Sequence, residues 1–231
     1  MKTSKTLKPF NQHIEAIDFL SLIKDMDSIS CVEEPIHPYI NEFKNMWSEH
    51  LTRGVVRDPL ILAPNIKDQN FSLEYKIGEY NTISTFSIGA INFLIQNKQL
   101  QVAQVFLDTI RNDIHFTETG NRILDSDYTK SPILAVVMPS NIGTNYSFYE
   151  IIDGNHRVSA ALASKKNIPI TLVQNLFLPP SAFATGNDWK LYHIVQGFLV
   201  LATGSTDAAQ YIIGLHGQLE YFYPIQNPTA D

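Results

Sequence analysis

The feature that most constrains the fold is the segment 151–162, IIDGNHRVSAAL, in which polar and ionisable residues separate two apolar stretches. The preceding residues, Tyr146–Ile152, are rich in aromatic and β-branched side chains and predict a strand, while Val158, Ala161 and Leu162 follow helical spacing. The charged turn therefore opens a helix. Because a helix N-terminus carries unpaired N–H groups and partial positive charge, the segment indicates a site for an anion, most simply a nucleotide phosphate.

The elements around this turn follow a recognisable order. Residues 132–138 and 146–152 predict two strands, 155–164 a helix and 168–173 a closing strand. Together with the motif Asp153–Arg157 (DGNHR), this order resembles the ParB/sulfiredoxin superfamily, whose signature is a strand, an Asp/Gly-Gly-x-His/Arg-Arg motif, a helix and a further strand. The resemblance implies an α+β fold in which a small mixed β-sheet is packed with helices.

The chain is expected to form a single domain with three regions. Residues 1–54 make an N-terminal helical region, 55–175 the ParB/sulfiredoxin-like core and 176–231 a C-terminal helical extension. The remaining predicted elements are a helix at 13–26, a helix at 38–51, a strand at 55–62 and a long helix over 88–114. The resemblance implies that the strand at 55–62 joins the core sheet.

Members of this superfamily use one pocket for different reactions. Departures of this chain from the family pattern therefore narrow the range of activities that the resemblance implies. Sulfiredoxins carry a nucleophilic cysteine where this chain has Asn155, and the only cysteine of the chain, Cys31, is far from the motif in sequence. The resemblance therefore excludes the sulfiredoxin repair reaction. The motif is most similar to that of the free serine kinase, which implies a nucleotide-binding protein that transfers or hydrolyses a phosphate of ATP or another nucleoside triphosphate, with Mg²⁺.

The resemblance also implies roles for the motif residues. Asp153 would hold the nucleotide and its metal ion, and Gly154 would let the backbone approach the phosphates. Asn155 lies in the same binding turn, and His156 and Arg157 would neutralise the charge that develops on phosphate transfer. His156 is thus both a nucleotide-binding and a catalytic candidate.

These residues also have structural alternatives. Asp153 or Asn155 can cap the helix, Gly154 can serve only a positive φ angle, and a histidine outside such a motif is more often a structural hydrogen-bonding group. Arg157 differs, because the helix dipole disfavours a cation in the first turn unless a carboxylate or a bound anion compensates its charge.

A general base or a further metal ligand would come from other carboxylates. Glu150, on the strand before the motif, is the second catalytic candidate, although strand alternation also allows its side chain to face solvent. Glu118, Asp125 and Asp127 precede the first core strand and are either oxygen ligands suited to Mg²⁺ or solvated loop acids.

The charge distribution argues against binding to nucleic acids. The chain has 17 Lys and Arg against 23 Asp and Glu, a formal net charge of −6. Two helices separated by a turn at Gly204–Ser205 resemble a helix-turn-helix, but residues 191–231 contain no Lys or Arg, and duplex affinity comes largely from cations set against phosphates. The expected partner is therefore a nucleotide or another phosphate ligand, and a ParB-like nuclease is the weaker alternative.

Two further expectations concern location and assembly. No apolar segment reaches the roughly 18 residues that span a bilayer, and the single cysteine agrees with a reducing compartment, so a cytoplasmic protein without membrane contact is expected. The apolar loop 176–187 could cover the pocket or dock a second subunit in a homo-oligomer. The main alternative to a catalyst is a non-catalytic regulatory or binding module of a bacterial mobile element.

Overall fold

The computed structural model describes residues 21–24, 36–53, 69–77, 80–116, 132–138 and 149–217. The predicted strand 55–62, the single cysteine and three candidate carboxylates lie outside these residues. The cysteine is Cys31, and the carboxylates are Glu118, Asp125 and Asp127. The elements are α2 (His37–Arg53), β1 (Asn70–Ile77), β2 (Tyr80–Ser87), α3 (Ile88–Gln96), β3 (Val102–Phe106), α4 (Leu107–Ile110), β4 (Ile114–His115), β5 (Leu134–Val137), β6 (Tyr149–Asp153), α5 (Asn155–Ala163), β7 (Pro169–Val173), the 3-10 helix η3 (Pro180–Ala182), α6 (Gly186–Leu201) and α7 (Thr206–His216).

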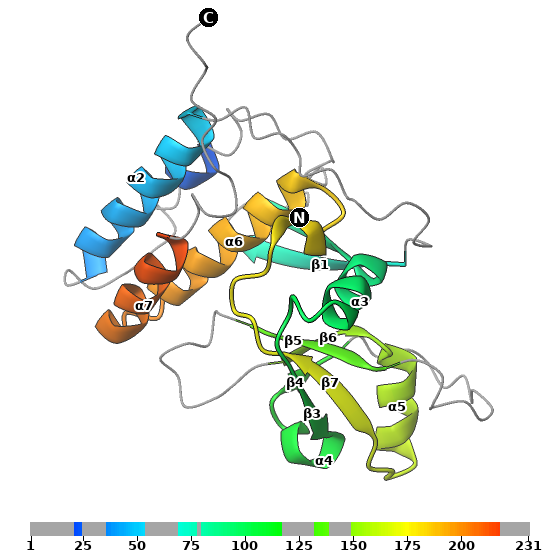
Figure 1. Cartoon of the computed structure of the whole chain (residues 1–231). Coiled ribbons are helices and arrows are strands. Elements are labelled where there is room, and N and C mark those ends of the chain that lie inside the picture. Colours follow the sequence, from blue (N-terminus) through cyan, green and yellow to red (C-terminus); the bar gives the residue numbers. More distant parts are fainter. Residues whose placement is uncertain are drawn as a thin grey trace, which may run out of the picture.

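A five-stranded mixed sheet carries the motif (Figure 1). Its strand order is β3-β7-β5-β6-β4, with antiparallel pairing of β3 with β7 and of β5 with β6, and parallel pairing of β5 with β7 and of β4 with β6. β1 and β2 form a separate antiparallel two-stranded sheet. The prediction of an α+β fold with a small mixed sheet is confirmed.

Alternating side chains on β6 divide the core between the two faces of the sheet. Ile151 packs with Val158 and Ala161 of α5 in a smaller core, which also contains side chains of α4. Ile152 points to the opposite face, where a larger core joins the sheet to α2, α3, α6, α7 and the β1–β2 hairpin. Figure 1 shows the same arrangement, with α5 beside the sheet and α2, α6 and α7 grouped away from it.

The predicted N-terminal and C-terminal helices pack against each other. The helix predicted at 38–51 is α2, and residues 21–24 of the helix predicted at 13–26 are also helical. The indole Nε1 of Trp47 in α2 donates a hydrogen bond of 3.0 Å to Nδ1 of His216 in α7. Gly197 of α6 lies so close to Phe43 that a Cβ on the glycine would be 2.4 Å from Cε2 of the ring.

The predicted long helix over 88–114 is wrong. α3 ends at Gln96, Lys98 adopts a left-handed φ of 58°, and the chain continues as β3, the short helix α4 and β4. Val102, Val105 and Phe106 fit helical spacing, but Val102–Phe106 also fits a strand, and antiparallel pairing with β7 decides between the two. The β1–β2 hairpin is not among the elements predicted from the sequence.

The apolar loop 176–187 belongs to the core. Phe177, Leu178 and Phe183 are 6%, 1% and 0% exposed, and they pack with α6 and the hairpin in the larger core. Trp189 and His193 of α6 both donate hydrogen bonds to the carbonyl oxygen of Leu178, at 2.9 and 3.1 Å. These apolar side chains are therefore not available to cover a pocket or to dock a second subunit.

Candidate functional site

The motif forms the turn between β6 and α5. β6 ends at Asp153, Gly154 has φ 93° and ψ 19°, and α5 begins at Asn155. A Cβ on Gly154 would lie 2.8 Å from Cγ1 of Ile133, so both the left-handed backbone and the contact require glycine. As the N-cap residue, Gly154 provides no side-chain acceptor for the first N–H groups of α5.

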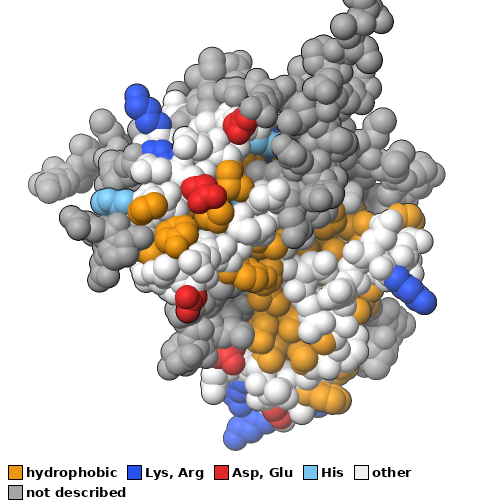
Figure 2. All heavy atoms as spheres, turned by 60° about the vertical axis from the view of Figure 1, so that its left-hand side comes forward, with side chains coloured by type: hydrophobic (Ala, Val, Ile, Leu, Met, Phe, Trp, Pro, Cys, Tyr) orange, Lys and Arg blue, Asp and Glu red, His pale blue; other side chains and the backbone are white. Residues whose placement is uncertain are grey.

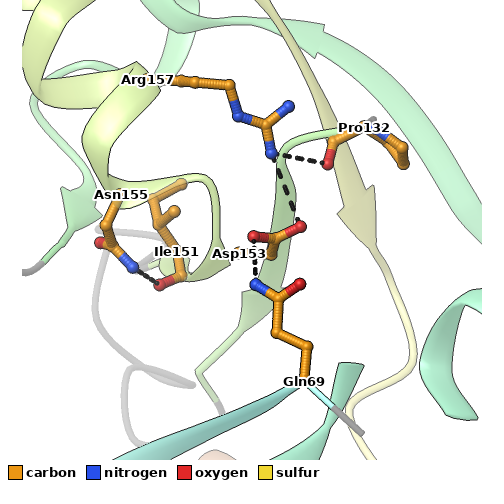
Figure 3. A network of polar contacts seen from close by, with 6 residues as sticks. All are labelled: Gln69, Pro132, Ile151, Asp153, Asn155 and Arg157. Carbon is orange, nitrogen blue, oxygen red and sulfur yellow. Dashed lines mark hydrogen bonds and ion pairs between the residues drawn. The ribbon is translucent and has the colours of Figure 1, made fainter. Parts of the chain in front are cut away.

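Asp153 and Arg157 form the centre of a polar network (Figure 3). Oδ1 of Asp153 accepts a hydrogen bond of 3.1 Å from Nε2 of Gln69, and Oδ2 lies 3.5 Å from Nη2 of Arg157. The same Nη2 donates to the carbonyl oxygen of Pro132 at 3.2 Å. A carboxylate thus provides the compensation that a cation in the first helical turn requires.

Asn155 and His156, the first two residues of α5, differ in exposure and contacts. Nδ2 of Asn155 donates a hydrogen bond of 3.1 Å to the carbonyl oxygen of Ile151, which ties the turn to β6 (Figure 3). His156 is exposed to solvent. Of the two, His156 has the more exposed side chain.

Glu150 is buried on the sheet face opposite to α5. It is 3% exposed, and its Oε2 lies 2.7 Å from Nδ1 of His115, the residue aligned with it in the parallel β4–β6 pair. Burial raises the pKa of Glu150 to about 7, against the opposing effect of His115. The alternative that Glu150 faces solvent is therefore wrong.

Glu150 also affects the pKa of a buried side chain, that of Tyr192. Tyr192 of α6 is fully buried, and its hydroxyl has no hydrogen-bond partner among the residues that the structure describes. Burial raises the pKa of Tyr192, and the negative charge of Glu150 raises it further.

The structure brings together only part of the predicted site. Asp153, Gly154, Asn155 and Arg157 share one turn with His156 beside them, whereas Glu150 faces the other side of the sheet. The two catalytic candidates, His156 and Glu150, are therefore separated by the sheet. Sequence reasoning missed His115, because its short strand β4 lies at the end of the segment predicted as a long helix.

Asp153 is the residue predicted to bind a metal ion. Within the described ranges, no group of three or more His, Cys, Asp or Glu side chains could hold a metal ion. The turn still offers one carboxylate, and Mg²⁺ is often bound through one or two carboxylates together with substrate phosphates. Asp153 therefore fits a metal ion that arrives with a nucleotide.

Comparison with known proteins gives no match. No family model matches the chain, and neither do the curated proteins or the solved structures. The ParB/sulfiredoxin resemblance stays a prediction based on the motif and on the order of the elements. Among the helices of the described residues, none is both long enough and apolar enough to cross a bilayer.

Proposed function

We propose that the β6–α5 turn binds the phosphates of a nucleotide, ATP or another nucleoside triphosphate, together with Mg²⁺. The observation that carries this proposal is the start of α5: a left-handed glycine without a capping side chain, an exposed His156 and Arg157 in the first turn. Backbone N–H groups, an imidazole and a guanidinium are all donors suited to a phosphate.

Binding would exchange the partners of Arg157. The 3.5 Å separation from Asp153 is longer than the 2.7–2.9 Å of a strong charge-assisted hydrogen bond, so a phosphate can compete for the guanidinium. Asp153 would keep its hydrogen bond from Gln69 and present its other oxygen to the Mg²⁺ carried by the nucleotide. His156 would neutralise charge on the phosphate from the solvent side.

Phosphate transfer or NTP hydrolysis would depend on His156 at the turn. Glu150 could contribute only from the opposite face of the sheet, where its hydrogen bond goes to His115. A second candidate is therefore a non-catalytic regulatory or binding module. This candidate is favoured by the Asp153–Arg157 pair, which balances the charges of the motif without any ligand.

The first experiment measures thermal unfolding with ATP, CTP, GTP, ADP or inorganic phosphate, each with and without Mg²⁺. His156→Ala removes an exposed side chain, so its ligand-free Tm should equal that of the wild type. Lys165→Ala, two residues after the end of α5, is the control for loss of an exposed polar side chain. We expect a nucleotide to raise the Tm of the wild type and of the control, and to raise that of His156→Ala less.

Arg157→Ala provides the stronger test of location. Its ligand-free Tm should fall because the contacts with Asp153 and Pro132 are lost, so the shift is measured relative to its own ligand-free value. A shift of wild-type size in the His156→Ala/Arg157→Ala double variant would contradict the proposed site. No shift of the wild type with any ligand would contradict nucleotide binding itself.

Phosphate release separates the two candidates. A catalyst should release phosphate from the nucleotide that binds, and His156→Ala should abolish the release while retaining the fold. Ligand-induced stabilisation without product would support the non-catalytic module.

A further inference from the structure

β3 is an edge strand without the usual protection. In the part of the chain that the structure describes, it pairs only with β7. Its sequence, VAQVF, contains no charge, proline or glycine, although natural sheet edges are commonly protected by charged residues, proline or bulges. Val102 and Phe106 are 38% and 56% exposed. Figure 2 shows a patch of hydrophobic side chains in the lower half of the molecule, which holds the five-stranded sheet in Figure 1.

The hydrogen bonds to β7 determine which peptide groups face outward. The N–H of Gln174 donates to the carbonyl oxygen of Gln101, and the N–H of Leu107 donates to that of Ile168, both at 2.9 Å. In an antiparallel pair, residues bonded to the neighbouring strand alternate with residues whose peptide groups point away. The N–H and C=O groups of Val102, Gln104 and Phe106 therefore point away from β7, at the edge of the sheet.

We propose that β3 pairs antiparallel with β3 of a second copy of this chain, with the two-fold axis at Gln104. In this register Gln104 faces Gln104 of the second copy, and Val102 faces Phe106. All three outward residues form hydrogen-bonded pairs, so the two five-stranded sheets join into one.

The chemistry of the edge favours a second copy as the occupant. The register places apolar side chains opposite apolar side chains and an amide opposite an amide, and it brings no like charges together on the strand. Lys98 precedes β3 and Asp108 follows it, and both are exposed. Because the two strands run in opposite directions, the end with Lys98 in one copy lies beside the end with Asp108 in the other, which is charge-complementary.

Sedimentation of the full chain over a wide concentration range tests the pairing. We expect a concentration-dependent dimer in the wild type that is lost in V102K and in F106E, since each places a charge against an apolar side chain. The double variant V102K/F106E should recover the dimer, because each lysine then faces a glutamate of the second copy. F93K, on the exposed face of α3, is the control and should dimerise like the wild type.

A wild type that remains monomeric at every concentration would overturn the proposal. A dimer that survives in both single variants would do the same. Far-UV circular dichroism of each variant checks that a lost dimer does not reflect a lost fold.

Disulfide trapping tests the register separately. In a C31S background, Q104C should cross-link to itself on mild oxidation, because hydrogen-bonded antiparallel pairs lie about 5.5 Å apart between Cα atoms, within disulfide range. V102C faces residue 106 of the second copy and should not cross-link to itself. Efficient cross-linking of V102C with none in Q104C would overturn the register. The outcome does not depend on nucleotide binding.

Discussion

At the residue scale, Gly154 combines two separate requirements. Its φ of 93° disfavours any side chain, and a Cβ would also meet Ile133 at 2.8 Å and Nη2 of Arg157 at 2.9 Å. We expect Gly154→Ala to lower the free energy of unfolding by about 1–3 kcal/mol. Urea unfolding measures the loss.

Gly204 is the matched control for this substitution. It has a comparable φ of 74°, but a Cβ there would meet no heavy atom within 4 Å. Gly204→Ala should therefore lose only about 1 kcal/mol, from the backbone strain alone. Equal losses at the two positions would show that the contact with Ile133 and Arg157 does not matter.

Glu150 makes stability depend on pH near neutrality. Burial raises its pKa from 4.5 to about 7, so the folded state binds more protons than the unfolded state between these values. Its contribution to stability is fully present below pH 4.5 and is lost as the pH rises through 7. From pH 5 to pH 8, the free energy of unfolding of the wild type should therefore fall by about 1–3 kcal/mol more than that of Glu150→Gln. Urea unfolding at the two pH values measures this change.

His115 supplies a control for the cause of this shift. The hydrogen bond and the charge of His115 lower the pKa of Glu150 and so oppose the effect of burial. His115→Ala should extend the pH-dependent loss of stability to a higher pH, because the pKa of Glu150 in the folded state rises further. If Glu150→Gln and the wild type show the same pH dependence from 5 to 8, Glu150 does not titrate in this range.

The sequence identified the residues of the turn but not their partners. The need for compensation at Arg157 follows from its place in the first helical turn, and the structure supplies Asp153. Nothing in the sequence pointed to Gln69, which is 84 positions from Asp153, or to His115 beside Glu150. Such contacts between distant segments depend on the topology of the sheet.

At the element scale, the contact between α2 and α6 depends on Gly197. A Cβ on this residue would lie 2.4 and 2.6 Å from two ring atoms of Phe43, which is itself fully buried. Gly197→Ala should lower stability by about 1–3 kcal/mol, because overpacking exceeds the gain in helix propensity. Thermal and urea unfolding report the change.

Gly214 of α7 is the matched helical glycine. A Cβ there would meet no heavy atom within 4 Å, so Gly214→Ala should stabilise the protein by about 0.5–1 kcal/mol. Stabilisation by both substitutions would contradict the close approach of α2 and α6.

The elements that the sequence predicted best are those that local pattern determines. The strands β5, β6 and β7 and the helix α5 fall within or within one residue of their predicted ranges, because apolar runs and a glycine turn mark them clearly. The helix predicted over 88–114 was wrong because the apolar residues of the segment fit both helical and strand spacing. Pairing with β7 selects the strand for Val102–Phe106. The β1–β2 hairpin, with sequences NFSLEYKI and YNTISTFS, has too weak a pattern to stand out.

At the scale of the whole molecule, buried histidines join the helices around α6. Burial lowers the pKa of His193 to about 3 and that of His50 to about 4, and it places the pKa of His216 well below its ordinary value. Nδ1 of His216 accepts the indole N–H of Trp47, which requires the unprotonated ring nitrogen. The folded helices therefore hold these three histidines in the neutral form.

Acid should consequently unfold the protein. Below pH 6.5 the unfolded chain binds protons at these histidines and the folded chain does not, so stability falls as the pH is lowered, by up to about 1.4 kcal/mol per pH unit and histidine. Burial raises the pKa of Glu150 and of Asp188, and these two carboxyl groups oppose the trend set by the three histidines. Thermal unfolding of Glu150→Gln from pH 7 to 4 should show a steeper fall in Tm than the wild type, because one of the opposing groups is removed. A constant Tm over this range would contradict neutral buried histidines.

We propose that a nucleotide phosphate binds at the turn Asp153–Arg157. The most direct measurement is a titration of the ¹⁵N-labelled protein with the nucleotide that gives the largest thermal shift, in Mg²⁺, followed by the backbone amide resonances. Saturable shifts largest at Gly154, Asn155 and His156, and absent at those residues in Arg157→Ala, are the predicted result. Saturable shifts confined to other elements, or none at saturating nucleotide, would contradict the claim.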